Sequence, residues 1–168
     1  MEKITLTDRT TVYLGLGSNL GDRLGYLQQA LAALAPQVSL AACSSVYETE
    51  PWGFAEQAKF LNQAAAGETT LPPRDLLAHL KAIEAALGRA PTFRYGPRCI
   101  DIDILLYGDL ILESPDLTIP HPRLHERAFV LLPLADLAPD LRHPVLHKSI
   151  RQLLAELPGA QLSASPLF

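Results

Sequence analysis

The sequence has few of the residues that mark several protein classes. Among its 168 residues are two cysteines, one methionine and one tryptophan, and only 19% of the residues are charged. Cys43 and Cys99 are far apart and have no CxxC partners, so we expect buried free thiols rather than a disulfide framework or a zinc knuckle. With 48% hydrophobic residues the chain is too apolar to be disordered. We therefore expect one domain over residues 1–168 with an ample core.

No segment has the composition of a membrane span or a secretory signal. The longest stretch without a charged side chain, residues 24–47, contains Pro36 together with several glutamines and serines. The first eleven residues include no apolar run, so we expect a cytoplasmic protein. The net charge of -4 argues against binding nucleic acid through bulk electrostatics, so any anion site must be local.

Arginine is more abundant than lysine, by ten residues to four, and half of the arginines lie between residues 89 and 127. The guanidinium group has rigid, forked donors that suit phosphate. This cluster indicates a local phosphate site.

Hydrophobic periodicity predicts an α+β fold. The expected elements are a strand over 11–17, a helix over 20–34, strands over 38–47 and 59–68, a helix from 72–73 to Gly88, and a strand over 100–108. This order is the ferredoxin-like βαββαβ arrangement, with an antiparallel sheet and both helices on one face. A C-terminal extension should hold short strands near 110–112 and 117–120, and helices over 125–137 and from 150.

Three local details accompany this prediction. Asn19 is the candidate N-cap of the first helix. Pro133 should break or kink the helical segment over 125–137, because proline is tolerated only in a first helical turn. Ser149 and Gln152 have the spacing of a capping box for the last helix.

The segment RYGPRCIDIDILLYG carries the strongest chemical signal. Alternation along a strand puts Asp101, Asp103, Leu105 and Tyr107 on one face, and the isoleucines with Leu106 on the other. Two adjacent carboxylates on an open face repel each other unless a cation lies beside them, and oxygen ligands on a strand suit Mg2+. The alternative is a solvated strand face without function.

The Arg-rich loop before this strand favours the metal site. Arg89, Arg94 and Arg98 all lie within reach of the same strand end. Arg98 stands three residues before Asp101, so on a regular strand it would face away from the carboxylates. We therefore predict that residues 96–98 are still loop and that the Arg98 guanidinium turns back toward the site.

The segment GLGSNLGD follows a strand and opens a helix, like a dinucleotide-binding fingerprint. The third glycine of that motif is missing, since position 20 is Leu20. We expect Gly15 and Gly17 to form a tight strand-to-helix turn.

Aromatic and imidazole groups supply further candidates. Phe60 and Asn62 share a strand face and could stack on and hydrogen-bond a flat heterocycle, with Trp52 and Phe129 as other candidates, although each is also a common core residue. The paired histidines, His121 with His125 and His143 with His147, have a metal-site spacing only on a helix, and the prolines beside them argue against a helix there. His121 could instead contact an anion.

Four motifs in this order resemble the 6-hydroxymethyl-7,8-dihydropterin pyrophosphokinase family of folate biosynthesis. They are GLGSNLGDR, SSVYETEPWG with FLNQA, YGPRCIDIDILLYG and IPHPRLHERAFVLLPLADLAP. The resemblance implies transfer of pyrophosphate from ATP to the hydroxymethyl oxygen of the pterin, releasing AMP. It also implies two Mg2+ ions and small-molecule substrates. From the net charge and the composition we expect no nucleic-acid or membrane partner, and we expect a monomer.

The resemblance also assigns roles to residues. It implies metal ligands at Asp101 and Asp103; catalytic arginines at Arg89 and Arg98; pterin contacts at Thr49, Trp52, Phe60, Asn62 and Phe129; and ATP contacts at Glu84, Arg98, Thr118, His121 and Arg127. The chain departs from some members at Glu50, Trp52, Asp116 and Pro122, and its loop over 89–98 is one residue shorter. Two other functions share parts of the pattern: a metal-dependent nucleotide hydrolase and a non-catalytic pterin- or nucleotide-binding module.

Overall fold

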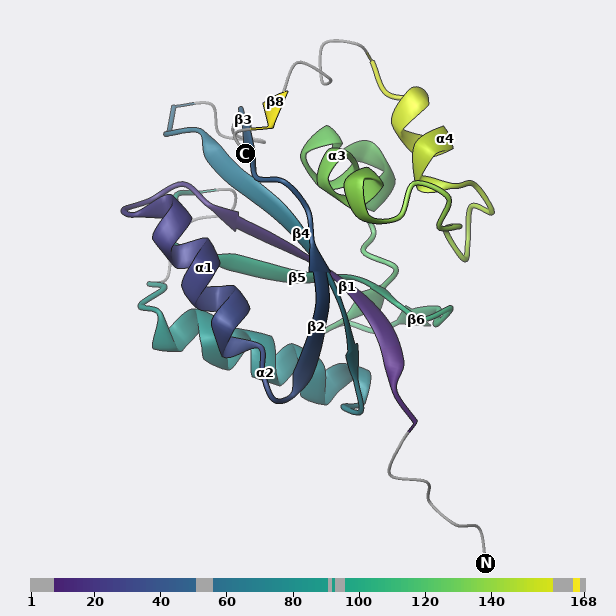
Figure 1. Cartoon of the computed structure of the whole chain (residues 1–168), viewed down its shortest axis with the longest axis horizontal. Helices are drawn as coiled ribbons and strands as arrows, with labels where there is room; N and C mark the ends of the chain where they lie inside the picture. The colour runs from purple at the N-terminus through teal and green to yellow at the C-terminus, as the bar shows by residue number, and fades with distance from the viewer. Residues whose placement is uncertain (1–7, 51–55, 91, 93–95, 159–164, 167–168) are drawn as a thin grey trace, which may run out of the picture.

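The computed structural model describes residues 8–50, 56–90, 92, 96–158 and 165–166 (Figure 1). Its elements, in chain order, are β1 (Thr10–Ser18), α1 (Arg23–Ala33), β2 (Val38–Cys43), β3 (Tyr47–Thr49), β4 (Phe60–Thr69), α2 (Pro73–Ala86), β5 (Asp101–Tyr107), β6 (Leu112–Glu113), β7 (Thr118–Ile119), the 3-10 helix η1 (Leu124–Glu126), α3 (Ala128–Leu137), α4 (Ile150–Ala155) and β8 (Ser165–Pro166). None of the described helices has the length and apolar character needed to cross a membrane.

The main sheet has the strand order β5-β1-β4-β3-β8. β2 pairs with the C-terminal part of β4 and β3 with its N-terminal part. Every strand pair in it is antiparallel. The order confirms the ferredoxin-like core predicted from hydrophobic periodicity. It also makes β1 and β4 central strands, each with a neighbouring strand on both sides.

Helices cover both faces of the sheet. α1 and α2 lie on one face, as predicted, and pack over a core that includes Leu14, Leu80 and Ile102 (Figure 1). α3 and α4 lie on the other face, where Leu131 and Leu153 belong to a second apolar cluster. The face carrying Asp101 is therefore not open along its whole length, because the C-terminal helices bury part of it.

A bulge in β5 changes the alternation expected from the sequence. Tyr13 of β1 pairs with Leu106 and the next residue, Leu14, pairs with Ile104, so Leu105 has no partner. Leu105 and Leu106 both join the α3–α4 cluster, and Tyr107 turns to the α2 side. The predicted faces of Leu106 and Tyr107 are therefore wrong.

The first helix and the second strand differ clearly from their predicted bounds. α1 begins three residues later than expected, because Asp22 rather than Asn19 is its N-cap and accepts a hydrogen bond from the Gly25 N–H at 3.1 Å. The single strand expected over 38–47 is divided into β2 and β3, because residues 44–46 leave the ladder with β4.

Three further predictions concern single residues. Pro133 does not break the helix: it lies inside α3, and the interruption falls at Arg127, whose extended backbone separates η1 from α3. The capping box of Ser149 and Gln152 is confirmed at α4. Cys99 is buried as expected, but Cys43 is exposed on β2.

Candidate active site

A cavity opens between the sheet and α3, at the end of the sheet where β4 begins and β5 begins. Its lining comes from β1, β3, β4, β5, α3 and the residues beside them: Gly15, Leu16, Gly17, Thr49, Glu50, Phe60, Asn62, Gln63, Ala64, Arg98, Asp101, Asp103, Leu105, Arg127, Phe129, Val130 and Pro133. Eight of the residues proposed from the sequence therefore meet in one cavity: Thr49, Phe60, Asn62, Arg98, Asp101, Asp103, Arg127 and Phe129.

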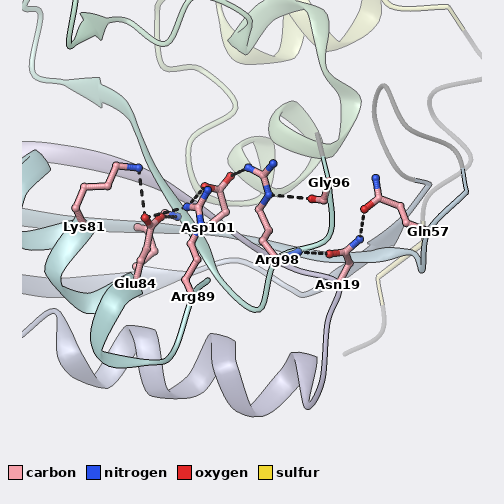
Figure 2. Close-up of polar contacts among 9 residues, drawn as sticks. Asn19, Gln57, Lys81, Glu84, Arg89, Gly96, Arg98 and Asp101 are labelled. Atoms are coloured by element: carbon pink, nitrogen blue, oxygen red, sulfur yellow. Dashed lines mark hydrogen bonds and ion pairs between the residues drawn. The ribbon is translucent and has the colours of Figure 1, made fainter. Parts of the chain in front are cut away.

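Asp101 and Asp103 begin β5, before the bulge, and both line this cavity. Asp101 makes ion pairs with Arg89, Nη1 to Oδ1 at 2.9 Å, and with Arg98, Nη1 to Oδ2 at 3.5 Å (Figure 2). Burial raises the pKa of Asp103 well above its usual range, and the negative charge of Asp101 adds to this rise. A cation beside both carboxylates would offset the unfavourable free energy of keeping two negative charges there.

The donor set suits Mg2+ bound partly by substrate. Among the residues that the structure describes, no group of three or more His, Cys, Asp or Glu side chains could surround a metal ion. The two carboxylates of β5 would thus leave most of the coordination shell to water and phosphate oxygens, which is how Mg2+ is usually bound in nucleotide-dependent enzymes. The residues present therefore fit the ion that the sequence predicts.

Glu84 lies under this site, on α2, and its side chain is 4% exposed. Its Oε2 accepts a hydrogen bond from the Ile102 N–H at 2.7 Å, and its Oε1 lies 2.9 Å from Arg89 Nη1 (Figure 2). Arg89 therefore bridges Glu84 and Asp101. Glu84 does not line the cavity, so its direct place in a nucleotide site stays a prediction.

Arg98 has the position expected from the sequence. Residues 96–98 are outside any strand, and the guanidinium turns back to Asp101, which confirms the predicted loop. Asn19, expected to be a helix cap, instead holds this loop: its Oδ1 accepts from the Arg98 N–H at 2.9 Å, and its Nδ2 donates to Gln57 Oε1 at 2.8 Å (Figure 2).

The sheet side of the cavity has a polar pair beside an aromatic ring. Asn62 Nδ2 donates to Thr49 Oγ1 at 2.5 Å, and both residues are 8% exposed. Phe60 lies on the same face of β4, two residues before Asn62.

Gly15 and Gly17 are strand residues and not the turn glycines that we expected; the turn has its positive φ at Gly21. A Cβ at Gly17 would lie 3.0 Å from Asn62 Oδ1. The missing side chain therefore leaves space in the cavity.

The opposite side of the cavity comes from α3. Phe129, Val130 and Pro133 face the sheet there, and the Arg127 guanidinium carbon lies 5.4 Å from the centre of the Phe129 ring. Arg127 also lines the cavity, so a cation and a flat ring are side by side.

His121 lies near these charges. Its ring Nδ1 accepts a hydrogen bond from the Arg123 backbone N–H at 3.2 Å, and the His121 backbone N–H donates to the Leu105 carbonyl at 3.0 Å. Burial lowers the pKa of His121 to about 4, and the positive charge of Arg127 contributes to this fall. His121 is therefore neutral at pH 7.

Four predicted residues that the structure describes do not line the cavity: Glu84, Arg89, Thr118 and His121. Thr118 pairs with Glu113 in the small β6–β7 sheet and does not line the cavity. Trp52 lies outside the described residues. Neither the place of Pro133 in the cavity wall nor the contact of Asn19 with the Arg98 loop was predicted from the sequence, because both depend on contacts between distant segments.

Comparison with known proteins agrees with this geometry. The sequence pattern of the family described as 7,8-dihydro-6-hydroxymethylpterin-pyrophosphokinase (HPPK) matches residues 13–139. The chain is 42% identical over 146 residues to a 2-amino-4-hydroxy-6-hydroxymethyldihydropteridine pyrophosphokinase of Aquifex aeolicus, covering 87% of this chain and 91% of that one. It is 48% identical over 157 residues to the protein of the same name in Pseudomonas aeruginosa, covering 92% and 96%.

Solved structures support the fold. A crystal structure of HPPK-DHPS from Plasmodium falciparum superposes with a TM-score of 0.73 at 19% identity, over 93% of this chain and 47% of that one. The chain thus spans less than half of that longer protein. The extent of the family match and the identity to its members together show that the chain belongs to the HPPK family.

Proposed function

We propose that this protein transfers pyrophosphate from ATP to the hydroxymethyl group of 6-hydroxymethyl-7,8-dihydropterin in folate biosynthesis, and that the reaction requires two Mg2+ ions. One observation carries the proposal: two carboxylates and two arginines meet in the same cavity as an amide and two phenylalanine rings. The first group suits a polyphosphate with its metal ions, and the second suits a flat, hydrogen-bonding ring system.

In this reaction the hydroxymethyl oxygen attacks the β-phosphorus of ATP. A new oxygen–phosphorus bond forms, the bond from the β-phosphorus to the bridging oxygen of the α-phosphate breaks, AMP leaves, and the hydroxyl proton is released. Such transfers depend on alignment and on charge neutralisation rather than on a covalent step. When bound, Mg2+ neutralises charge on the phosphate oxygens.

The charged residues divide between holding the metal and binding phosphate. Asp101 and Asp103 are the proposed ligands of both ions. Arg89 and Arg98, which lie 2.9 and 3.5 Å from Asp101 oxygens, would contact the phosphates. Their guanidinium groups can exchange a carboxylate partner for phosphate oxygens, because both anions accept paired hydrogen bonds from arginine.

The uncharged residues of the cavity would recognise the pterin. Asn62 and the Thr49 segment would hydrogen-bond its edge, and Phe60 and Phe129 would stack on its two faces, since they come from opposite walls of the cavity. Trp52 is a further proposed contact.

On the nucleotide side we propose contacts from His121, Arg127 and Thr118. Neutral His121 would donate one hydrogen bond, and Arg127 would contribute charge. Glu84 would act there too, through its ion pair with Arg89. The cytoplasmic location, the monomeric state and the single domain over the whole chain stay predictions.

The test is a product analysis with ATP, Mg2+ and 6-hydroxymethyl-7,8-dihydropterin, separating AMP, ADP and the pterin diphosphate. We expect AMP and the pterin diphosphate in equal amounts, and neither when EDTA is added. ADP, or nucleotide cleavage without pterin, would indicate a nucleotide hydrolase. Ligand binding without turnover would indicate a binding module, and either result would overturn the proposal.

A further inference from the structure

One hydrogen bond joins the two walls of the cavity just beyond its lining. The hydroxyl of Tyr47, on β3, donates to the Asp136 carboxylate of α3, with both carboxylate oxygens at 2.9 Å. Asp136 Oδ2 also accepts from the Ser45 N–H at 3.3 Å. Tyr47 is 7% exposed, so this contact is largely shielded from water. Neither residue lines the cavity itself.

Each partner is linked directly to a proposed pterin contact. Tyr47 is two residues from Thr49 on β3, and it pairs with Asn62 across the β3–β4 ladder. Asp136 is seven residues after Phe129 and three after Pro133, so the three positions share one side of α3. The hydrogen bond thus connects the strand that carries the polar pair with the helix that carries the ring.

The composition of α3 gives this contact its importance. Its sequence is AFVLLPLADL, in which Asp136 is the only polar side chain. Apolar packing has no preferred direction, so it resists separation of the helix from the sheet better than it resists rotation or sliding. A short hydrogen bond to a charged group requires a defined geometry, and only Asp136 can supply one from a side chain of α3.

We propose that Tyr47 and Asp136 are a positioning pair that sets the rotation and spacing of α3 over β3 and β4, and thereby the gap in which the pterin binds. The inference rests on the proposed pterin site. Neither residue touches the substrate; both act through Phe129, Thr49 and Asn62. Burial and the hydrogen bond to the Asp136 carboxylate raise the pKa of Tyr47 to about 12, so the hydroxyl is protonated and can donate at neutral pH.

The test compares Tyr47→Phe, Asp136→Ala and the double variant. We measure the pterin Kd and the ATP Kd by calorimetry, and KM for each substrate with kcat. We expect each single variant to weaken pterin binding about tenfold, the loss of one hydrogen bond to a charged group. The double variant should be no weaker than the single ones, and the ATP Kd should stay within twofold of the wild-type value.

Tyr107→Phe is the matched control. Its hydroxyl also makes one short hydrogen bond, to the Leu71 carbonyl at 2.7 Å, but on the α2 side of the sheet. It should lower the melting temperature without changing the pterin Kd. Asp136→Asn keeps an acceptor oxygen and should weaken pterin binding less than Asp136→Ala; it serves as the folded alternative if Tyr47→Phe does not fold.

The outcomes separate the two proposals. If the wild-type protein does not bind the pterin, the proposed function fails. If it does, and Tyr47→Phe and Asp136→Ala bind pterin as well as Tyr107→Phe does, the positioning pair is overturned. Equal losses of pterin and ATP binding would also overturn it, because they would indicate a general loss of structure.

Discussion

The carboxylate of Glu84 accepts a hydrogen bond from the Ile102 N–H at 2.7 Å, between the two aspartates of β5. A buried acidic side chain on α2 thereby holds the backbone that carries both proposed metal ligands. The same carboxylate pairs with Arg89, which also contacts Asp101 (Figure 2). Strand, helix and Arg-rich loop are therefore connected through one side chain.

Glu84→Ala should lower the free energy of unfolding by about 2–3 kcal/mol, because it leaves the buried Ile102 N–H without its acceptor. Urea denaturation measures this change. Glu156→Ala is the control: Glu156 pairs with Lys148 at an exposed site, so its loss should cost under about 1 kcal/mol. Equal costs for the two variants would show that Glu84 does not hold β5.

Asp101→Asn and Asp103→Asn should each reduce turnover about 100-fold or more, because each removes a charge that would hold Mg2+. Asp103→Asn should not destabilise the fold, since burial of the charge and its repulsion by Asp101, which together raise the pKa of Asp103, both disappear with the charge. Thermal unfolding adds a second measurement: Mg2+ with a non-hydrolysable ATP analogue should raise the melting temperature of the wild type more than that of either variant. Asp109→Asn, at an exposed turn, should behave as wild type.

Gly17→Ala should weaken pterin binding about tenfold, because the new methyl group would lie 3.0 Å from Asn62 Oδ1 and 3.5 Å from Phe60. Calorimetric titration with the pterin measures the effect. Gly15→Ala is matched to it on the same strand, but its methyl group would meet the movable end of Leu105 at 3.3 Å. A loss no larger than that of Gly15→Ala would remove Asn62 from the proposed pterin contacts.

His121 makes stability depend on pH. Its pKa is about 4 in the folded protein and near 6.5 when unfolded, so between these values the unfolded chain binds more protons. The free energy of unfolding should therefore fall as the pH is lowered from 6.5 to 4, by up to about 3 kcal/mol from this residue.

His121→Asn should flatten this dependence, and its Oδ1 can still accept the hydrogen bond that Arg123 N–H donates to Nδ1. Denaturation at a series of pH values compares the slopes. His147→Asn, at an exposed position, should keep the wild-type slope. Parallel curves for the His121→Asn variant and the wild type would contradict the assignment.

Local patterns predicted a large part of this molecule. The leucine stripes and strand alternation led to the βαββαβ order, because the buried face of each element repeats with the period of its backbone. The DxD spacing and the preceding arginines located the carboxylate site, since neighbours in sequence are neighbours on one strand end. The family resemblance named the pterin-side candidates, and the fold brings Phe60, Asn62 and Phe129 into one cavity.

Other features arise only from packing between distant segments. The bulge at Leu105 depends on pairing with β1, and the covering of the aspartate face depends on α3, whose contacts lie in another part of the chain. The Tyr47–Asp136 hydrogen bond spans 89 residues of sequence. The sequence by itself thus determined which elements form and which residues carry charge. Only the tertiary structure decided which side chains meet, because contact distances between elements depend on how the elements pack and not on their periodicity.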